Sequence, residues 1–334
     1  MSRTDEHRER GAALLSVLLL VAVMAVIAAV MLERLNLATR LAANGQAMTQ
    51  ARLAATSAET LAMARIKALV DADPDKTVDR VGILGRTIPL PLGRAGIDAR
   101  IEDAGNCFNV NSLVETNALN EFSLRPVALG QLRALMAGLA IPEGDAFPLS
   151  DAMADWIDSD DAAAPNGAED AWYRAQPVPY RSAGRLIADV SELRAVKGMT
   201  PVLYERLRPW LCALPAAELS PVNINTLRVE QARLLSMLGP QAIPLARARA
   251  VIAGRPATGY ATTEQAMRVL GAGSGEDGLN GGLPLNQLQV RSRWFLLTQT
   301  VTVDSVRLEE QALFDVGLNP PRVAARSWGG LDSR

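Results

Sequence analysis

Residues 10–31 read RGAALLSVLLLVAVMAVIAAVM, an arginine and a glycine followed by twenty residues, 12–31, that carry no charge. As an α-helix, such a run spans about 30 Å, which matches the hydrocarbon core of a bilayer. A secretory signal has a shorter apolar centre, about 7–15 residues, and a small-residue cleavage site in a break after it. Here helix-forming residues continue, and no proline occurs before Pro74. The sequence therefore predicts one helix of about 55–60 residues, with a membrane-spanning half at 12–31 and an amphipathic half at 32–74.

The amphipathic half should pack on the rest of the chain through one apolar face. Its larger apolar residues recur irregularly, and we expect them to form that face: Leu35, Leu37, Leu41, Met48, Leu53, Leu61 and Ile66. Residues 1–10 contain three arginines and three acids, so charge gives only a weak positive-inside orientation.

The composition excludes several kinds of site. The chain has 334 residues and a net charge of −2, which indicates neither disorder nor a polyanion-binding surface. Its single histidine, His7, precedes the apolar run, so a chain without the leader has no imidazole for a Ser-His-Asp site or a metal. Two cysteines are too few for a thiolate zinc site, and any metal site must use oxygen ligands. From composition alone, Cys107 and Cys212 are either buried thiols or one long-range disulfide.

Strand-like segments occur near both ends of the chain. Residues 81–92 and 95–104 are short and β-like, and 286–316 alternates with β-branched and aromatic residues. About 170 residues of helical pattern separate them, which indicates an α+β domain with a large α-helical insertion. We place the α+β domain at 75–112 and 286–318 and the insertion at 113–285. Residues 319–334 are expected to be a flexible tail.

Two similar motifs divide the insertion. CFNVNSL at 107–113 and PVNINTL at 221–227 each place Asn-x-Asn before a helical run, which fits helix capping and predicts two related subdomains, about 113–215 and 221–270.

Segments 190–211 and 222–252 resemble helix-hairpin-helix units. DNA-binding forms place backbone amides and basic residues on phosphates, but region 150–200 is acidic and the chain has only three lysines, so a SAM-like structural module is favoured. GSGEDG at 273–278 lacks the strand-to-helix context of a phosphate loop.

An acidic stretch at 151–173, DAMADWIDSDDAAAPNGAEDAWY, holds seven carboxylates and no lysine or arginine before Tyr173. Asp158, Asp160 and Glu169 stand at positions 1, 3 and 12 of an EF-hand-like count, although the glycine at position 6 is missing. Crowded carboxylates beside aromatic residues repel unless a cation neutralises them. Chemistry leaves two alternatives open here, a calcium ion in an irregular loop or a solvated acidic face.

The N-terminus resembles that of type IV prepilins, with a short arginine-containing leader (1–11), a glycine, a small residue and an uninterrupted apolar helix. The resemblance implies cleavage by prepilin peptidase after Gly11 and N-methylation of Ala12 as the mature N-terminus. Cleavage on the cytoplasmic side leaves the apolar helix on the product, where it can pack in a filament. Most pilin-like proteins carry glutamate at the fifth mature position, where this chain has Ser16. A subunit without that charge suits a special position better than a repeated one.

The ordered set of motifs resembles the type II secretion protein K family, whose members are the largest minor pseudopilins. The motifs are RGAALLSVLLLVAVMAV, GNCFNVNSL, DWIDSDD with GAEDAWY, PYRSAGR, SELRAVKGMTPVLYERLRPWL and VNINTL. The resemblance implies a pilin-like fold, α+β with a long N-terminal helix, a small antiparallel sheet and an all-α insertion. It also implies a single-pass inner-membrane protein, mostly in the periplasm, at the tip of a pseudopilus. Its implied partners are the I- and J-type minor pseudopilins, the major pseudopilin and the inner-membrane assembly platform.

The same resemblance implies calcium in the insertion, and it transfers a ligand set to this chain: Asp158, Asp160, Asp161, Glu169 and Asp170. A periplasmic location would favour a disulfide between Cys107 and Cys212 that closes the first subdomain. After PYRSA the family often continues with Asn-Arg-Pro, whereas this chain has Gly184-Arg185-Leu186, so a contact made by that asparagine is not transferred.

Three functions compete at this point. The first is a structural pseudopilus-tip subunit without catalytic activity and without nucleic acid as a partner. The second is a membrane-tethered DNA receptor of an uptake system that uses its helix-hairpin-helix segments. The third, a membrane-anchored hydrolase, would need all-carboxylate catalysis because the mature chain lacks histidine.

Overall fold

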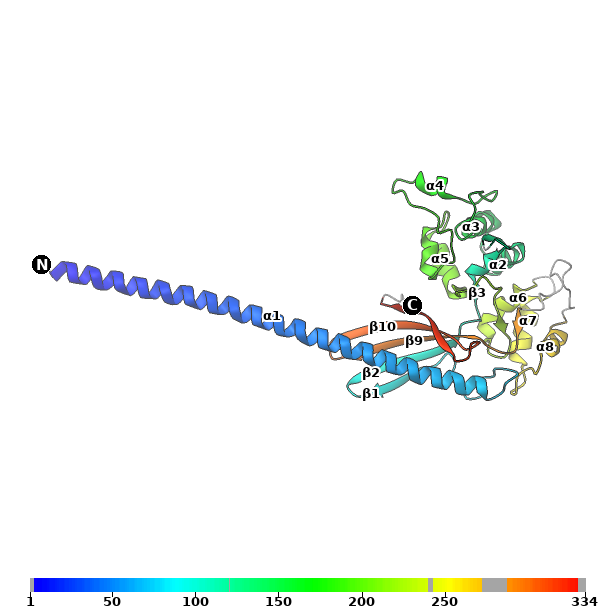
Figure 1. The fold of residues 1–334 in the computed structure, drawn as a ribbon, viewed down its shortest axis with the longest axis horizontal. Coiled ribbons are helices and arrows are strands. Elements are labelled where there is room, and N and C mark those ends of the chain that lie inside the picture. Colours follow the sequence, from blue (N-terminus) through cyan, green and yellow to red (C-terminus); the bar gives the residue numbers. More distant parts are fainter. Residues whose placement is uncertain (1–2, 120, 240–242, 272–286, 330–334) are drawn as a thin grey trace.

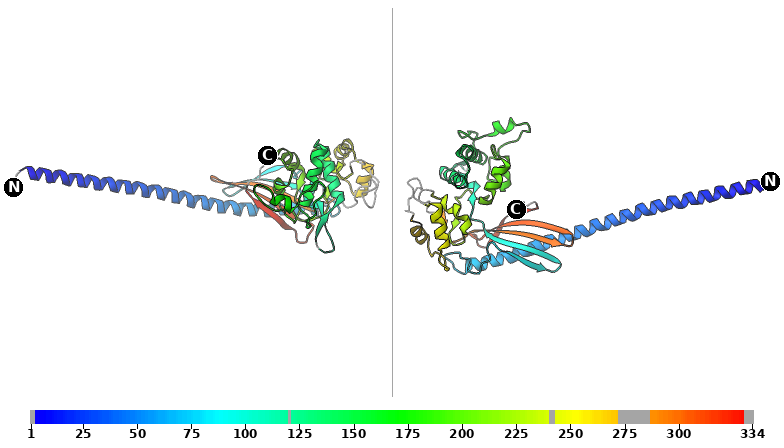
Figure 2. Two further views of the ribbon diagram at one scale, coloured as in Figure 1. Left: turned by 90° about the horizontal axis from the view of Figure 1, so that it is seen from above. Right: turned by 180° about the vertical axis from the view of Figure 1, so that it is seen from behind.

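A long helix, a five-stranded sheet and a helical region make up the molecule, seen in a computed structural model (Figure 1). The structure describes residues 3–119, 121–239, 243–271 and 287–329, and side chains from residue 14 onward. Helix α1 extends from the N-terminus to the far end of the molecule, where the sheet lies along its C-terminal half. The helical region lies beyond and above the sheet, at the end opposite the N-terminus (Figures 1 and 2).

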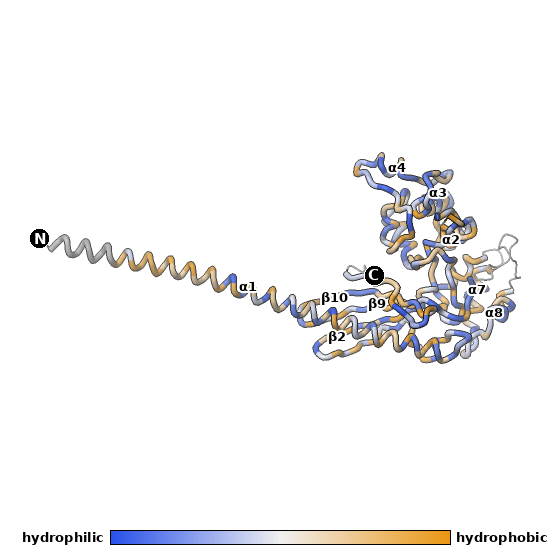
Figure 3. The backbone as a smooth tube through the Cα atoms, in the orientation of Figure 1, coloured by the Kyte–Doolittle hydropathy of each residue, from blue (hydrophilic) through white to orange (hydrophobic). Residues whose placement is uncertain are grey.

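Helix α1 spans Arg3–Asp71, 69 residues, and so begins earlier than the sequence predicts. Among the described residues it is the one helix long and apolar enough to cross a membrane, and its most apolar window is not buried within the molecule. The apolar half is continuous in Figure 3 and projects away from the folded body. This arrangement is that of an N-terminal membrane anchor.

The packing face of α1 differs from the leucine stripe expected from the sequence. Leu35, Leu37, Leu41, Leu53 and Leu61 are all exposed. Two of the expected residues do face the sheet, since Ile66 is buried and Met48 is partly buried against it. The rest of the buried face consists of small residues at helical spacing, followed by one valine: Ala47, Ala51, Ala54, Ala55, Ala58, Ala62 and Val70. Alanine lets the helix backbone approach the sheet closely, so here side-chain size rather than hydrophobicity selects the contact face.

The sheet is antiparallel, with strand order β1-β2-β9-β10-β11. Its strands are β1 (Thr87–Leu92), β2 (Ala95–Asp103), β9 (Trp294–Val303), β10 (Val306–Asp315) and β11 (Arg322–Trp328). The expected strand segments at both chain ends therefore meet, because β2 pairs with β9 from Gly96↔Thr302 to Asp103↔Phe295. Alternate residues of β9, such as Phe295, Leu297 and Val301, are buried against α1.

Strand β11 corrects the expectation of a flexible tail at 319–334. Residues 322–328 pair with β10, from Glu310↔Trp328 to Asp315↔Arg322. Sequence pattern alone missed this strand because RVAARSW is mostly exposed and shows no apolar alternation. The strand is held by its ladder with β10, by the packing of Val323 and Ala324, and by the side chain of Arg326.

That residue, Arg326, belongs to a buried ionic network between α1 and the sheet. Its Nε and Nη2 lie 2.6 Å from the two carboxylate oxygens of Glu59, and its Nε lies 3.1 Å from Glu310 Oε1. Gln299 Nε2 donates to Glu310 Oε2 at 2.6 Å and to the carbonyl of Ala55 at 3.1 Å. Burial and the neighbouring Glu59 raise the pKa of Glu310 to about 8. Although burial opposes it, the Arg326 guanidinium holds the pKa of Glu59 below its usual value. The network joins four elements, α1, β9, β10 and β11.

The helical region divides at two short parallel strand pairs. Strand β3 (Phe108–Asn109) pairs with β6 (Leu211–Cys212), and β7 (Val222–Asn223) pairs with β8 (Leu288–Gln289). We call the segments that these pairs enclose the first and the second subdomain. The first contains β4 (Val114–Thr116), β5 (Phe122–Leu124), α2 (Pro126–Gly138), α3 (Glu143–Asp155), α4 (Asp170–Arg174) and α5 (Pro201–Leu207); the second contains α6 (Ala232–Ser236), α7 (Leu245–Ala253) and α8 (Thr263–Leu270). Short 3₁₀ turns complete both: η1 (Val110–Leu113), η2 (Val190–Ala195), η3 (Arg208–Trp210) and η4 (Val229–Gln231).

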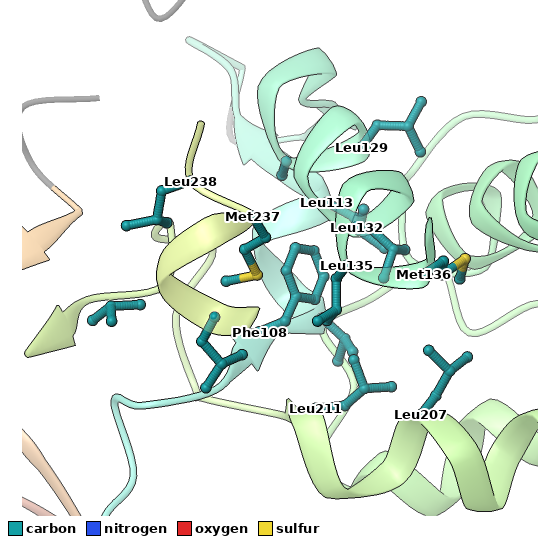
Figure 4. Packing of buried hydrophobic residues seen from close by; sticks show 14 of the residues in the cluster. Phe108, Leu113, Leu129, Leu132, Leu135, Met136, Leu207, Leu211, Met237 and Leu238 are labelled. Atoms are coloured by element: carbon teal, nitrogen blue, oxygen red, sulfur yellow. The ribbon is translucent and has the colours of Figure 1, made fainter. Parts of the chain in front are cut away.

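One hydrophobic core serves both subdomains. Phe108 is fully buried, with Leu135 of α2 and Met237 just after α6 beside it (Figure 4). A separate cluster of Leu214, Trp294 and Leu313 joins the first subdomain to the face of the sheet that α1 does not cover. The insertion is therefore packed onto the sheet rather than tethered to it.

The Asn-x-Asn motifs bind strands and loops that are distant in sequence. Asn109 accepts from the amides of Asn111 and Leu214 and donates to the carbonyls of Ala216 and Glu218. Asn111 bonds Ile187 in both directions and also donates to the Leu214 carbonyl. In the second subdomain Asn225 likewise bonds Tyr260 in both directions, and Asn223 donates to Ser292 Oγ. All four asparagines are buried, so each motif supplies the hydrogen bonds that water would otherwise make to several backbone groups.

A disulfide joins Cys107 to Cys212 beside the β3–β6 pair, with 5.8 Å between their Cα atoms and a sequence separation of 105. It therefore links the entrance of the first subdomain to its exit.

Candidate functional site

The acidic stretch forms a loop between α3 and α4, with both ends held by buried residues. Asp151 pairs with Arg133 and also accepts from Asn166 Nδ2 at 3.2 Å, which neutralises the first acid of the stretch. Lys197 Nζ donates to the carbonyl of Gly167 at 2.8 Å and so fixes the return of the loop. Edge-on contacts of Tyr173 with Trp156 and Trp172, at 5.0 Å between ring centroids, form an apolar wall beside it.

Three buried carboxylates meet inside this loop, from Asp155, Asp158 and Glu169. One oxygen from each lies within 4.8 Å of the other two. Asp155 accepts from the amide of Ala164, whereas Asp158 Oδ1 and Glu169 Oε1 are buried with no hydrogen-bond partner in the described part of the chain. Unpaired buried carboxylate oxygens are costly, and a cation is the usual partner that satisfies them.

The pKa shifts of this acidic triad likewise indicate that its carboxylates have too few positive partners. Burial raises the pKa of Asp155 to about 6, of Asp158 to about 7 and of Glu169 to about 8. Repulsion from the other acids of the loop adds to burial in all three cases. Without a cation, the triad therefore holds protons near neutral pH, because three buried charges cannot coexist so closely.

Gly167 permits the close approach on which the triad depends. A Cβ atom at this position would collide with the carboxylate of Asp155, so a residue with a side chain would displace one member of the triad. The turn expected at Asn166-Gly167 is therefore also a steric requirement of the site.

The structure brings together two of the five ligands expected by resemblance, Asp158 and Glu169. Asp160 is exposed and accepts from the amide of Ala162, and Asp161 is exposed. Asp170 is the first residue of α4, and Ser182 and Arg174 bond its carboxylate and hold its pKa below the usual value. These three acids lie outside the triad.

Asp155 is the member that the sequence argument missed. It precedes Asp158 by three residues, at the end of α3, and this spacing places both side chains on one face. The EF-hand-like count began at Asp158 and so excluded it. The i, i+3 pair of acids on either side of Trp156 was the available signal.

The expected processing residues lie near the free end of α1. Gly11 and Ala12 fall within the helix, and Ser16 is exposed in its apolar part. The GSGEDG segment at 273–278 lies outside the described residues.

Comparison with known proteins places these features in a family. Two family models, both for type II secretion system (T2SS) protein K, match residues 106–216 and 222–290. Type II secretion system protein K of Pectobacterium carotovorum subsp. carotovorum is 34% identical over 332 residues, 97% of each chain. The chain belongs to the type II secretion system protein K family.

Other members of the protein K family support the assignment over most of the length. The Aeromonas hydrophila protein is 34% identical across 97% of this chain and 98% of its own, and the Klebsiella pneumoniae protein is 37% identical across 77% and 78%. A chain in the crystal structure of the GspK-GspI-GspJ complex from enterotoxigenic Escherichia coli superposes with a TM-score of 0.73 at 29% identity, covering 86% of this chain and 98% of that one.

Membership of the protein K family confirms the α+β fold expected from the sequence, with its long N-terminal helix, antiparallel sheet and helical middle region. It makes the chain a pseudopilin, a structural component of a secretion system and not an enzyme. The hydrolase hypothesis is thereby removed.

Proposed function

We propose that this chain is the minor pseudopilin at the tip of the type II secretion pseudopilus. There it would initiate and cap assembly together with the I- and J-type minor pseudopilins, for export of folded proteins across the outer membrane. The observation that carries this proposal is the position of the insertion, at the end of the molecule opposite the apolar half of α1 (Figure 1). A further subunit stacked along α1 would meet the two subdomains, so the chain fits the end of a filament better than its middle.

Two further features support a terminal position. The enterotoxigenic Escherichia coli relative was crystallised as a GspK-GspI-GspJ complex, and this chain shares its fold over 86% of its length. Ser16 stands where pilin-like proteins usually carry the glutamate that pairs with a neighbouring subunit's amine. A subunit at the end of the filament has one neighbour fewer to contact.

We also propose the domain division on which this role depends. Residues 1–11 form a leader that prepilin peptidase removes after Gly11, and Ala12 becomes the methylated N-terminus. Residues 12–31 anchor the chain in the inner membrane, and 32–74 carry the sheet and insertion into the periplasm. The major pseudopilin and the inner-membrane assembly platform would contact α1.

We propose calcium as the ion of the acidic triad. Asp155, Asp158 and Glu169 supply only hard oxygen donors, which suit calcium and exclude a zinc site of the usual His or Cys type. A bound calcium ion would neutralise the triad and satisfy Asp158 Oδ1 and Glu169 Oε1. Its role would be to hold the loop between α3 and α4 in place, and not to take part in a reaction.

Labelling of pseudopili tests the tip role. A small epitope inserted at the exposed Leu119, in a loop of the first subdomain, would be located on sheared pseudopili by immunogold electron microscopy. We expect one gold cluster at one end of each filament, and loss of filaments when the gene is deleted. Label distributed along the filament would contradict the proposal. As a matched control, the same epitope on the major pseudopilin should label the whole length.

A further inference from the structure

A cleft of about 610 Å³ lies where the sheet and both subdomains meet. Its walls come from the end of β2 at Glu102, from the Cys107–Cys212 disulfide and from the segment after α7 at Arg255. Because three parts of the fold contribute, the cleft exists only when the insertion is packed onto the sheet. It lies apart from the acidic triad and shares no residue with it.

The acids that line this cleft already have partners. Asp103 accepts from Thr226 Oγ1, Ser292 Oγ and the Gly105 amide, and Asp79 accepts from the amides of Ile83 and Leu84. Glu102 lies 2.8 Å from Arg100 Nη2 and 3.1 Å from Arg228 Nη1. Apart from the contacts of Glu102 with Arg100 and Arg228, none of these three carboxylates forms an ion pair with a further cation in the wall within the described ranges.

Arg255 is such a cation. Its Nη1 donates to the carbonyls of Ile224 and Leu227, at 2.6 and 2.9 Å, and no carboxylate in the described ranges pairs with it. Burial lowers the pKa of Arg255, because desolvation disfavours the charged guanidinium. Carbonyl groups fix the guanidinium in position but do not neutralise it. Arg80, exposed at the rim of the same cleft, has only a distant ion pair, at 4.0 Å from Asp73.

We propose that this junction cleft binds a carboxylate group, held by Arg255 with Arg80 at the rim. A guanidinium presents its donors in a planar fork that matches a carboxylate. Leu84, Leu211, Leu296 and Pro256 line the cleft as well, and they would contact the carbon atoms next to the carboxylate. Repulsion from the three acids of the wall increases with the charge of the ligand, so a singly charged carboxylate is favoured over a multiply charged anion such as phosphate. Either a free organic acid or an acidic side chain of another protein segment offers this chemistry.

Calorimetric titration of the full chain in detergent micelles tests the proposal. The probes are butyrate, the capped tripeptide acetyl-Leu-Asp-Leu-amide and its Asn counterpart. We expect the Asp peptide to bind at least ten-fold more tightly than the Asn peptide, and Arg255→Gln to remove that difference. Arg249→Gln, which changes an exposed arginine of α7 outside the cleft, is the matched control and should leave the affinities unchanged.

A second variant keeps the test decisive if Arg255→Gln fails to fold. Ala257→Trp fills the cleft from an exposed position and leaves the hydrogen bonds of Arg255 in place; it should weaken binding of the Asp peptide at least ten-fold. Butyrate that binds as tightly as the Asp peptide would identify a free organic acid as the source, and tighter peptide binding would identify a protein segment. The proposal is overturned if neither probe binds up to millimolar concentration, or if both variants bind them as the wild type does. Neither result depends on the tip role.

Discussion

Replacement of Arg326 by glutamine should destabilise the protein strongly, although the residue lies near the C-terminus in a strand that is mostly exposed. The guanidinium makes two contacts of 2.6 Å with Glu59 and one of 3.1 Å with Glu310. The carboxylate side chains are 6% and 0% exposed, so neither can recover hydration when the arginine is removed.

The magnitude follows from the burial of the two acids. Removal of one partner of a buried ion pair costs about 3–5 kcal/mol because it leaves an uncompensated charge. The arginine side chain itself is 38% exposed, so solvent screening places the expected loss near the lower limit, about 3 kcal/mol. Arg326→Lys keeps the charge but loses the bidentate geometry, and we expect about 1 kcal/mol.

The pH dependence distinguishes this network from simple loss of packing. The pKa of Glu310 is raised to about 8 from a model-compound value of 4.5, so the folded state binds an extra proton between these values. Its contribution to stability is complete below pH 4.5 and decreases as the pH rises toward 8. Glu59 behaves in the opposite way, because Arg326 holds its pKa low; its contribution is present above pH 4.5 and is lost in acid. Without Arg326 both acids would retain protons to higher pH, so the difference between variant and wild type should widen from pH 5.5 to 8.5.

Urea unfolding of the full chain in micelles, followed by tryptophan fluorescence, measures these free energies at both pH values. The Arg326→Gln and Glu59→Gln single variants and their combination complete a double-mutant cycle, in which the two losses should fall short of additivity by more than 1 kcal/mol. A loss below about 0.5 kcal/mol at pH 8.5, or a difference that stays constant with pH, would refute the reasoning.

Three further predictions concern the expected sites. Gly11→Leu should leave unprocessed precursor on immunoblots, whereas normal processing would remove the prepilin interpretation. Calcium chelation should lower the melting temperature, and Asp158→Ala combined with Glu169→Ala should abolish that shift; if chelation changes nothing in the wild type, the triad holds no calcium. Replacing Cys107 and Cys212 by serine should cost roughly 4–5 kcal/mol by loop entropy for a closure of 105 residues, and two free thiols on mass mapping of wild type from the periplasm would contradict the bond.

The main architecture could be predicted because it depends on patterns that are local in the sequence. A long uninterrupted helix and two strand-rich ends are visible without tertiary knowledge, and β2 and β9 do pair across the insertion. The packing face of α1 could not be predicted from hydropathy, because leucines and alanines both count as apolar. Only the closeness of the sheet decides that Ala51 and Ala55 are fully buried while Leu53 stays exposed.

The candidate metal site could also be predicted only in part from the sequence. Composition restricted it to oxygen ligands, and the acidic stretch located it within about twenty residues. Which acids converge depends on their neighbours: Ser182 and Arg174 bind Asp170, and Arg133 binds Asp151. All three partners lie outside the stretch, so a count of residues along the loop cannot show which of its acids are already bound.

The two Asn-x-Asn motifs hold the large insertion together at two corresponding positions. In each subdomain a buried asparagine bonds both backbone groups of one distant residue, Ile187 for Asn111 and Tyr260 for Asn225. The same device thus closes each subdomain at its junction with the sheet, and the disulfide reinforces the first closure only. Under the proposed tip role, these contacts would carry a force applied through α1 into the insertion.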